Sequence, residues 1–200
     1  YNSVEKLKND FEEKFRIADV YENLKKTANG EIVSDNSKIT FERYIMGSYF
    51  EQVLYYANLR FSKMTGGRYE IVRGESRDKR ISAGLEISVR DNFNNKERDI
   101  SSLSGGESFQ ASLALALGLS DIIQQRNGGI RLDSIFIDEG FGSLDNDSLA
   151  SAIETLNDLT GNGNRLVGII SHISELKNSI GNKIEVVGTK SGSSIKIITD

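Results

Sequence analysis

Two short apolar runs in the second half of the chain, each preceded by a helical pattern, constrain the fold most. The run SIFI begins at Ser134 after a helical pattern over about 107–125, and RLVGIIS begins at Arg165 after another over about 148–159. When helices and strands alternate in this order, the strands lie parallel and the helices form the crossovers. The sequence therefore predicts an α/β fold with parallel core strands.

The chain opens with an amphipathic helical pattern. From Val4 its apolar residues recur at steps of three and four, with Glu and Lys between them, as one face of a helix requires. Two interpretations are open: a surface helix packed on its own domain, or the stump of a coiled coil whose partner helix lies outside this chain. The polar, turn-rich residues 29–40 then indicate a connection.

A second helix is predicted over about 41–64, and its apolar positions are unusually aromatic. The glycines of TGG at 65–67 are expected to end it. We expect one buried face, made of Phe41, Tyr44, Ile45, Tyr49, Val53, Tyr56, Leu59 and Met64.

Two strand-like runs follow, RYEIVR from Arg68 and LEISVR from Leu85, and they frame the most basic part of the chain. A solvated hairpin face is one explanation of the positive charge, and a contact with a nucleic-acid phosphate backbone is the other. The basic residues are Arg68, Arg73, Arg77, Lys79, Arg80 and Arg90. A further hairpin is expected at the end of the chain, around Ser191 and Gly192.

Composition limits the classes of function. The chain has 200 residues, 38% of them hydrophobic, which is enough for a core. It carries 29 acidic and 25 basic residues, so any nucleic-acid contact must come from a local patch. The absence of cysteine excludes disulfides and thiolate metal sites.

No signal pattern or apolar run of membrane-spanning length is visible in the sequence, so we expect a soluble, cytoplasmic protein without a membrane partner. The chain begins at Tyr1, directly in a helical pattern, and contains no proline. We expect it to be a piece of a longer protein.

The paired acids Asp138 and Glu139 follow the strand SIFI directly. Ligands bind at such strand ends in open α/β sheets. Two adjacent carboxylates cost on the order of 1 kcal/mol unless a cation or a catalytic role compensates. Mg2+ with a phosphate ester fits, with Asp138 holding the metal and Glu139 orienting or deprotonating a water. The alternative is a strand end with two solvated acids.

Two more features can belong to the same site. In LSGGE, Ser104 with Gly105 and Gly106 stands where a helix begins, so a hydroxyl, free N–H groups and the helix dipole can meet an anion such as a terminal phosphate. A plain N-cap with a glycine turn would look similar. His172 is the sole histidine and follows the second predicted parallel strand, which places it within reach of the same phosphate unless it is structural.

The order LSGGE, FIDEGFGSLD, IISH resembles the C-terminal half of an ABC-type P-loop ATPase head of the SbcC family, whose members are SMC-like ATPase subunits of bacterial nucleases that process DNA ends. The residues after the paired acids are more similar to SbcC than to SMC or transporter heads. The resemblance covers about residues 39–188 and implies a C-terminal lobe over 31–200. It also implies that residues 1–30 return from a coiled coil, so that N-terminal helices come from the coiled-coil base.

The resemblance implies roles for individual residues, with ATP and Mg2+ as cofactors. LSGGE, with Ser104, Gly105, Gly106 and Glu107, is the signature motif, and IFIDE is the Walker B strand with Asp138 and Glu139. Ser143, Leu144 and Asp145 form the D-loop, and His172 is the switch histidine.

The implied partners are the N-terminal half of the same head, a second head that pairs on ATP, an SbcD-type nuclease subunit and double-stranded DNA. The phosphate-cradling motif G-x-x-x-x-G-K-[ST] is absent, and in this family it belongs to the N-terminal half. We therefore expect ATP hydrolysis only when both halves are joined and an inactive chain in isolation. The alternative is a non-catalytic, SMC-like structural head.

Overall fold

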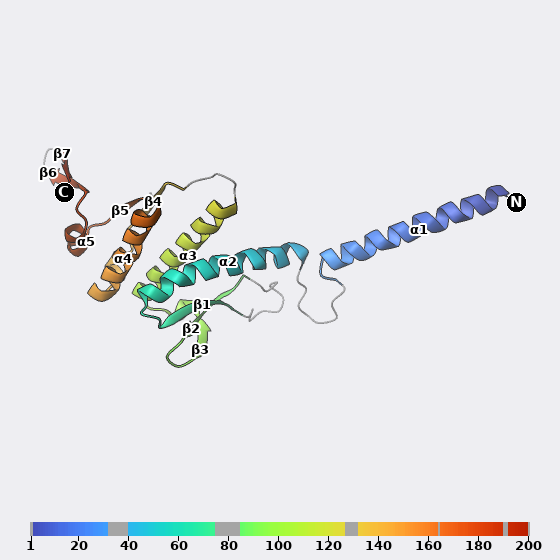
Figure 1. The fold of residues 1–200 in the computed structure, drawn as a ribbon, viewed down its shortest axis with the longest axis horizontal. Coiled ribbons are helices and arrows are strands. Elements are labelled where there is room, and N and C mark those ends of the chain that lie inside the picture. Colours follow the sequence, from blue (N-terminus) through green and yellow to red (C-terminus); the bar gives the residue numbers. More distant parts are fainter. Residues whose placement is uncertain are drawn as a thin grey trace.

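The computed structural model describes residues 2–31, 40–74, 85–126, 132–163, 165–189 and 192–199 (Figure 1). Its first elements are α1 (Asn2–Ala28), α2 (Phe41–Met64), β1 (Tyr69–Arg73), β2 (Ile87–Asp91), β3 (Lys96–Asp99) and a 3-10 turn, η1 (Ile100–Ser102). They are followed by α3 (Gly105–Arg126), β4 (Ser134–Asp138), the 3-10 turn η2 (Phe141–Ser143), α4 (Asn146–Gly163), β5 (Leu166–Ile170), α5 (Ser174–Ser179), β6 (Lys183–Thr189) and β7 (Gly192–Ile198).

The predicted parallel pair is confirmed. β4 and β5 pair in parallel, from Ser134 opposite Leu166 to Asp138 opposite Ile170, and α4 forms the crossover between them. Ile135 and Ile137 of β4 are half-buried against the core, because alternate side chains of a strand point to opposite faces. The carboxyl ends of both strands therefore lie at the same edge.

The outer face of this strand pair is apolar and exposed. Phe136, Leu166 and Ile170 are 70%, 64% and 57% exposed, although apolar side chains in a sheet normally face a packed layer. The antiparallel pairing of β6 with β7 confirms the predicted hairpin, which has a similar face, with Ile184 opposite Ile197 and Val186 opposite Ile195. Each of these four residues is between 67% and 70% exposed.

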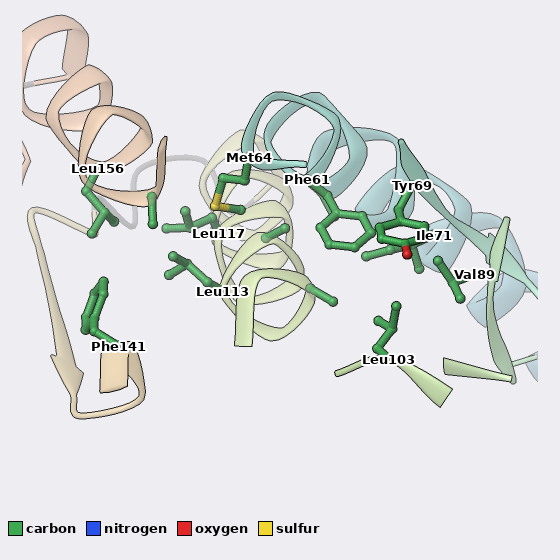
Figure 2. Close-up of a cluster of buried hydrophobic side chains, with 14 of the residues drawn as sticks. Phe61, Met64, Tyr69, Ile71, Val89, Leu103, Leu113, Leu117, Phe141 and Leu156 are labelled. Atoms are coloured by element: carbon green, nitrogen blue, oxygen red, sulfur yellow. The ribbon is translucent and has the colours of Figure 1, made fainter. Parts of the chain in front are cut away.

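The core joins α2, α3 and α4 to the small antiparallel sheet (Figure 2). Its largest fully buried side chains are Phe61, Phe141, Ile71, Leu117 and Val89. α2 and α3 form the most extensive contact between helices. A Cβ atom added to Gly118 of α3 would lie 2.7 Å from the Val53 carbonyl oxygen and the Ala57 nitrogen, so the two helices approach this closely only because residue 118 has no side chain.

β1, β2 and β3 form an antiparallel sheet in that order. The first two strands confirm the sequence prediction, whereas β3 was not predicted because KERD has no apolar alternation. α2 is fastened to the edge strand β1 by Asn58. The Asn58 side chain donates to the carbonyl of Ile71 (2.7 Å) and accepts from its N–H (2.8 Å).

The bounds of α2 are as predicted, but most of its predicted buried face is exposed. Val53 and Met64 are buried, whereas Phe41, Tyr44 and Leu59 are 62%, 67% and 56% exposed. Ile45 and Tyr49 are exposed as well, and Tyr56 is half-buried. The contacts with α3 and β1 involve the second half of the helix. They use a stripe that shares only Met64 with the predicted face and is made of Leu54, Ala57, Phe61 and Met64.

α1 extends away from the other elements (Figure 1). Its apolar side chains are exposed, with Leu7, Phe11, Phe15 and Tyr21 between 67% and 69%. The interpretation of α1 as a surface helix packed on its own domain is therefore wrong for the described residues. The coiled-coil interpretation stays a prediction. Among the described helices, none has the length together with the apolar content that crossing a bilayer requires.

The described part of the basic region is paired with carboxylates. Arg68 lies 3.4 Å from Asp91, and Arg73 lies 3.0 Å from Glu51. Arg90 contacts two acids, Glu70 at 3.2 Å and Glu97 at 2.7 Å. These three arginines fit the solvated-hairpin interpretation. Arg77, Lys79 and Arg80 lie outside the described residues, so a phosphate-backbone contact there stays a prediction.

Candidate functional site

Residues 103–107, which we call the glycine turn, begin α3 with a capping box. The Ser104 N–H donates to Oε2 of Glu107 (2.8 Å), and the Glu107 N–H donates to Oγ of Ser104 (3.3 Å). Each of these two side chains accepts a hydrogen bond from a backbone N–H group that has no carbonyl partner within the helix. The N–H groups of Gly105 and Gly106 lie in the first turn, where a helix has no upstream carbonyl to accept them. The turn is thus a helix cap that still presents donors.

The glycine turn packs against residues 138–143, which we call the acidic turn. A Cβ atom on Gly106 would lie 2.8 Å from the Ser143 carbonyl oxygen, and one on Gly105 would lie 3.5 Å from Cβ of Ser143. Glycine is therefore required at position 106 by this close approach, and its N–H also remains free in the first turn. Sequence reasoning had found only the free N–H.

The acidic turn begins where β4 ends. Asp138 is the last residue of the strand, and the Glu139 N–H donates to the Ile170 carbonyl (2.9 Å), which extends the ladder by one bond. Glu139 then adopts a left-handed conformation, with φ of 60°. A residue other than glycine in this region is strained by about 1–3 kcal/mol and is typical of functional sites. Glu139 thus lies one residue beyond the end of β4 in a strained backbone conformation.

His172 lies beside Glu139, as the parallel pairing of their strands predicts. Its Nδ1 is 3.1 Å from Oε1 of Glu139, and the two side chains are 79% and 61% exposed. Nδ1 therefore faces the carboxylate, and Nε2 faces away from it.

A small cavity of about 220 Å3 joins these groups. It is lined by Glu139, Gly140, Gly142, Ser143, Ser171, His172 and Ile173. The structure therefore brings Glu139, Ser143 and His172 together, and the glycine turn reaches the same place through Ser143. Ser143 itself donates from its hydroxyl to the Gly140 carbonyl (3.0 Å).

Asp145 lies at the start of α4 and acts as its cap. Its Oδ1 accepts from the Ser148 N–H at 2.8 Å. This backbone hydrogen bond lowers the pKa of Asp145 below its ordinary value, since it stabilises the ionised carboxylate. The structure thus gives Asp145 a capping role, and a nucleotide contact by this residue stays a prediction.

Sequence reasoning missed Phe109, which connects the glycine turn to the acidic turn. Gly140 has φ of 96°, and a Cβ atom there would lie only 2.2 Å from the Phe109 ring. The same ring meets Phe141 edge to face, with centroids 4.8 Å apart. No local sequence pattern indicates this contact, because it joins two turns that are far apart in the sequence. The two turns are held together as one unit.

The carboxylates at this site suit a metal ion that takes most of its ligands from substrate and water. Among the described residues, no three His, Cys, Asp or Glu side chains gather as a metal-binding group. Mg2+ in phosphate-handling sites is usually held by one or two carboxylates together with substrate oxygens and water. Asp138, exposed at the end of β4, fits the part of a single carboxylate ligand.

The fold is that of the ATPase heads of SMC proteins. A solved structure described as "Structural biochemistry of ATP-driven dimerization and DNA stimulated activation of SMC ATPases" has a TM-score of 0.61 and 16% identity, and the match covers 78% of this chain and 89% of that one. The Smc head domain from Pyrococcus furiosus has a TM-score of 0.57 and 18% identity, over 79% of this chain and 37% of that one.

Within this class, the chain belongs to the SbcC/RAD50-like family. The family described as "SbcC/RAD50-like, Walker B motif" matches residues 75–158. The SbcC component of the nuclease SbcCD from Vibrio cholerae serotype O1 is 49% identical over 177 residues, which make up 88% of this chain and 17% of the relative. Its counterpart in Staphylococcus epidermidis is 55% identical over 153 residues, 76% and 15% of the two chains. The chain thus spans about a sixth of the length of these relatives.

Proposed function

We propose that this chain is the C-terminal half of an SbcC-like ATPase head and supplies one part of an ATP-hydrolysing site. The observation that carries the proposal is the grouping of Glu139, Ser143 and His172 around one cavity, with the glycine turn packed against it. Two segments that are far apart along the chain line this cavity, and the glycine turn packs against one of them. Such convergence at the carboxyl ends of parallel strands is typical of ligand sites.

Each residue has a distinct role in this proposal. Asp138 holds Mg2+, which neutralises charge on the phosphates when it is bound. Glu139 orients the attacking water and accepts its proton. His172 contacts the γ-phosphate from the Nε2 side of its ring, which faces away from Glu139.

The glycine turn acts on a different nucleotide. Ser104, Gly105, Gly106 and Glu107 form the surface that closes over ATP bound to a second head, using the hydroxyl, the N–H groups and the dipole of α3. Ser143 packs against the turn, and Ser143 and Asp145 belong to the same surface in this proposal. ATP held between two heads joins them, and hydrolysis releases them.

The remaining half of the site comes from the N-terminal half of the same head. The exposed apolar faces of β4–β5 and β6–β7 support this partner, because a two-stranded sheet with an uncovered apolar face is marginal alone. Residues 1–30 form the returning stump of the coiled coil, and residues 31–200 form the C-terminal lobe. In the whole protein, the ATP cycle controls access of double-stranded DNA to an SbcD-type nuclease subunit.

A non-catalytic, SMC-like structural head is the second candidate. It would require ATP binding at most and would have no need for a second acid beside the metal ligand. The contact between His172 and Glu139 favours hydrolysis, because it holds the carboxylate that would orient the water in a defined position.

Glu139→Gln distinguishes the two candidates in a head reconstituted from this chain and its N-terminal half. The variant should bind ATP normally, because Asp138 remains, and lose nearly all steady-state phosphate release, because the amide cannot accept the proton. Glu175→Gln, which changes an exposed carboxylate of α5, is the matched control and should keep full turnover. Turnover of Glu139→Gln near the wild-type rate would contradict the catalytic role.

A further inference from the structure

Two consecutive residues of the acidic turn have positive φ. Glu139 has φ of 60°, and Gly140, which follows it, has φ of 96°. Glycine adopts this region without strain, whereas a residue with a side chain does not. A strained residue keeps its conformation only where the structure on both sides of it holds the chain. The contacts of Gly140 therefore determine whether Glu139 keeps its left-handed conformation.

The chain is fixed on both sides of these two residues. On one side, Asp138 pairs with Ile170 in the parallel sheet, and the Glu139 N–H donates to the Ile170 carbonyl at 2.9 Å. On the other side, Phe141 is 1% exposed and belongs to the apolar core, as Figure 2 shows. Only Glu139 and Gly140 connect the end of the strand to this buried side chain.

The ring of Phe109, from α3, lies directly against Gly140. A Cβ atom added to Gly140 would lie 2.2 Å from Cε2 and 2.5 Å from Cδ2 of Phe109. The same ring meets Phe141 edge to face, which is a favourable geometry for an aromatic pair. Phe109 thus contacts both the residue that follows Glu139 and the residue that anchors the turn in the core.

α3 holds the acidic turn at a second point. Gly106 lies three residues before Phe109 and therefore on the same face of the helix. A Cβ atom on Gly106 would lie 2.8 Å from the Ser143 carbonyl oxygen. Oγ of Ser143 donates in turn to the Gly140 carbonyl at 3.0 Å. One face of α3 thus holds the turn at Gly140 and at Ser143, and Phe109 supplies the side chain at the Gly140 end.

The Glu139 carboxylate depends on this backbone for its position. Its Oε1 lies 3.1 Å from Nδ1 of His172. The two side chains are 61% and 79% exposed, so packing restricts them little. A change of φ at Glu139 would turn its Cα–Cβ bond relative to the strand and move the carboxylate away from His172. The left-handed conformation is therefore needed to keep the carboxylate at the cavity.

We propose that Phe109 is a positioning residue for Glu139: its ring holds Gly140 and thereby keeps the Glu139 backbone in the conformation that directs the carboxylate to the attacking water. The inference rests on the proposed function, because it requires Glu139 to act on that water. It adds to the hydrolytic machinery a residue of α3 that lies outside the lining of the cavity.

Phe109→Leu tests the inference in the reconstituted head, because it keeps an apolar side chain and removes the ring. The kcat for phosphate release should fall about 10- to 100-fold, since a small displacement of a reacting group has an effect of this size. The KM for ATP should stay near that of wild type, because Asp138 and the N-terminal half are unchanged. Phe93→Leu, at a phenylalanine that is 77% exposed, is the matched control and should keep full turnover. A kcat near the wild-type value, or a change in KM alone, would overturn the inference.

A double-mutant cycle with Gly140 separates positioning from general destabilisation. Gly140→Ala should lower kcat, because the new Cβ meets the Phe109 ring and residue 140 has an unfavourable φ for alanine. In a Phe109→Ala background the ring is absent, so Gly140→Ala should lower kcat by a smaller factor. Equal factors in the two backgrounds would overturn the inference. Gly140 is exposed, so its variant also covers the case in which the Phe109 variants fail to fold, and an unchanged kcat of Gly140→Ala would then overturn the inference.

Glu139→Gln distinguishes failure of the inference from failure of the proposed function. If Glu139→Gln abolishes phosphate release while Phe109→Leu keeps the wild-type kcat, the positioning role is wrong and the function stands. If Glu139→Gln itself releases phosphate near the wild-type rate, Glu139 has no catalytic role and the proposed function fails.

Discussion

His172 reaches Glu139 with Nδ1 and leaves Nε2 free to face a ligand, while its side chain is 79% exposed. His172→Ala should therefore cost little stability. In the reconstituted head it should slow phosphate release by about a hundredfold, the order of magnitude for losing one donor to transition-state charge, with ATP binding nearly unchanged. Turnover and melting temperature are measured on the same preparation. A lower melting temperature with intact turnover would show that the histidine is structural.

Glu107 supports a prediction about pH. Its hydrogen bonds, chiefly from the Ser104 N–H, hold the pKa of Glu107 below the ordinary 4.5 despite burial. A carboxylate with a lowered folded-state pKa stabilises the fold above its ordinary pKa, and this contribution is lost as the pH falls through the lowered value. Wild type should thus exceed Glu107→Gln in unfolding free energy by up to about 1 kcal/mol at neutral pH.

Denaturant unfolding of both proteins, from neutral pH downward past the ordinary carboxylate pKa, measures this difference. The two free energies should converge as the pH falls. A difference that stays constant over the whole range would show that the charge of Glu107 contributes nothing to the cap.

The sequence predicted which site residues lie close together, but it did not predict their backbone conformation or their packing contacts. Asp138, Glu139 and His172 were expected together because the carboxyl ends of parallel strands meet at one edge, and the structure places Glu139 and His172 3.1 Å apart. The left-handed backbone of Glu139 and the contact of Phe109 with Gly140 depend on tertiary packing. No local residue preference predicts them.

The close packing of α2 against α3 depends on a single small residue, Gly118. Gly118→Ala should destabilise the chain by about 1–3 kcal/mol, because the new Cβ would lie 2.7 Å from backbone atoms of α2 that cannot move independently. Gly161→Ala, in α4 with nothing within 4 Å of the added atom, should instead stabilise by a few tenths to about 1 kcal/mol. Denaturant unfolding measures both, and a loss of stability equal in the two variants would contradict the close packing.

The sequence pattern predicted the bounds of α2 well, but it predicted neither the buried stripe of α2 nor the strand β3. Both bounds of α2 were predicted from the sequence, because a polar connection precedes it and Gly66 and Gly67 follow it with φ of 58° and 78°. Its buried stripe was not, since an aromatic-rich helix offers more than one apolar stripe and the contacts with α3 and β1 select among them. β3 was not predicted because all four of its residues are charged and show no apolar alternation.

The whole molecule has apolar surfaces that its own elements leave exposed. Leu7 and Phe15 of α1, Phe136 of β4 and Ile195 of β7 are each between 67% and 70% exposed. Apolar areas of this kind mark interaction surfaces. The absent phosphate-cradling loop led to the prediction of a missing half from the sequence, whereas the exposed apolar faces on which we propose that this half docks are visible only in three dimensions.

The most direct test of the account is ATP titration of this chain alone and after joining to its N-terminal half. The chain lacks the backbone cradle and lysine that supply most phosphate affinity in P-loop enzymes, and Asp138 and Glu139 repel a nucleotide. Calorimetry with Mg2+ and ATP should show no saturable heat for the isolated chain at micromolar concentration and background phosphate release, with binding and turnover only in the joined head. Micromolar ATP binding by the isolated chain would contradict the half-site account.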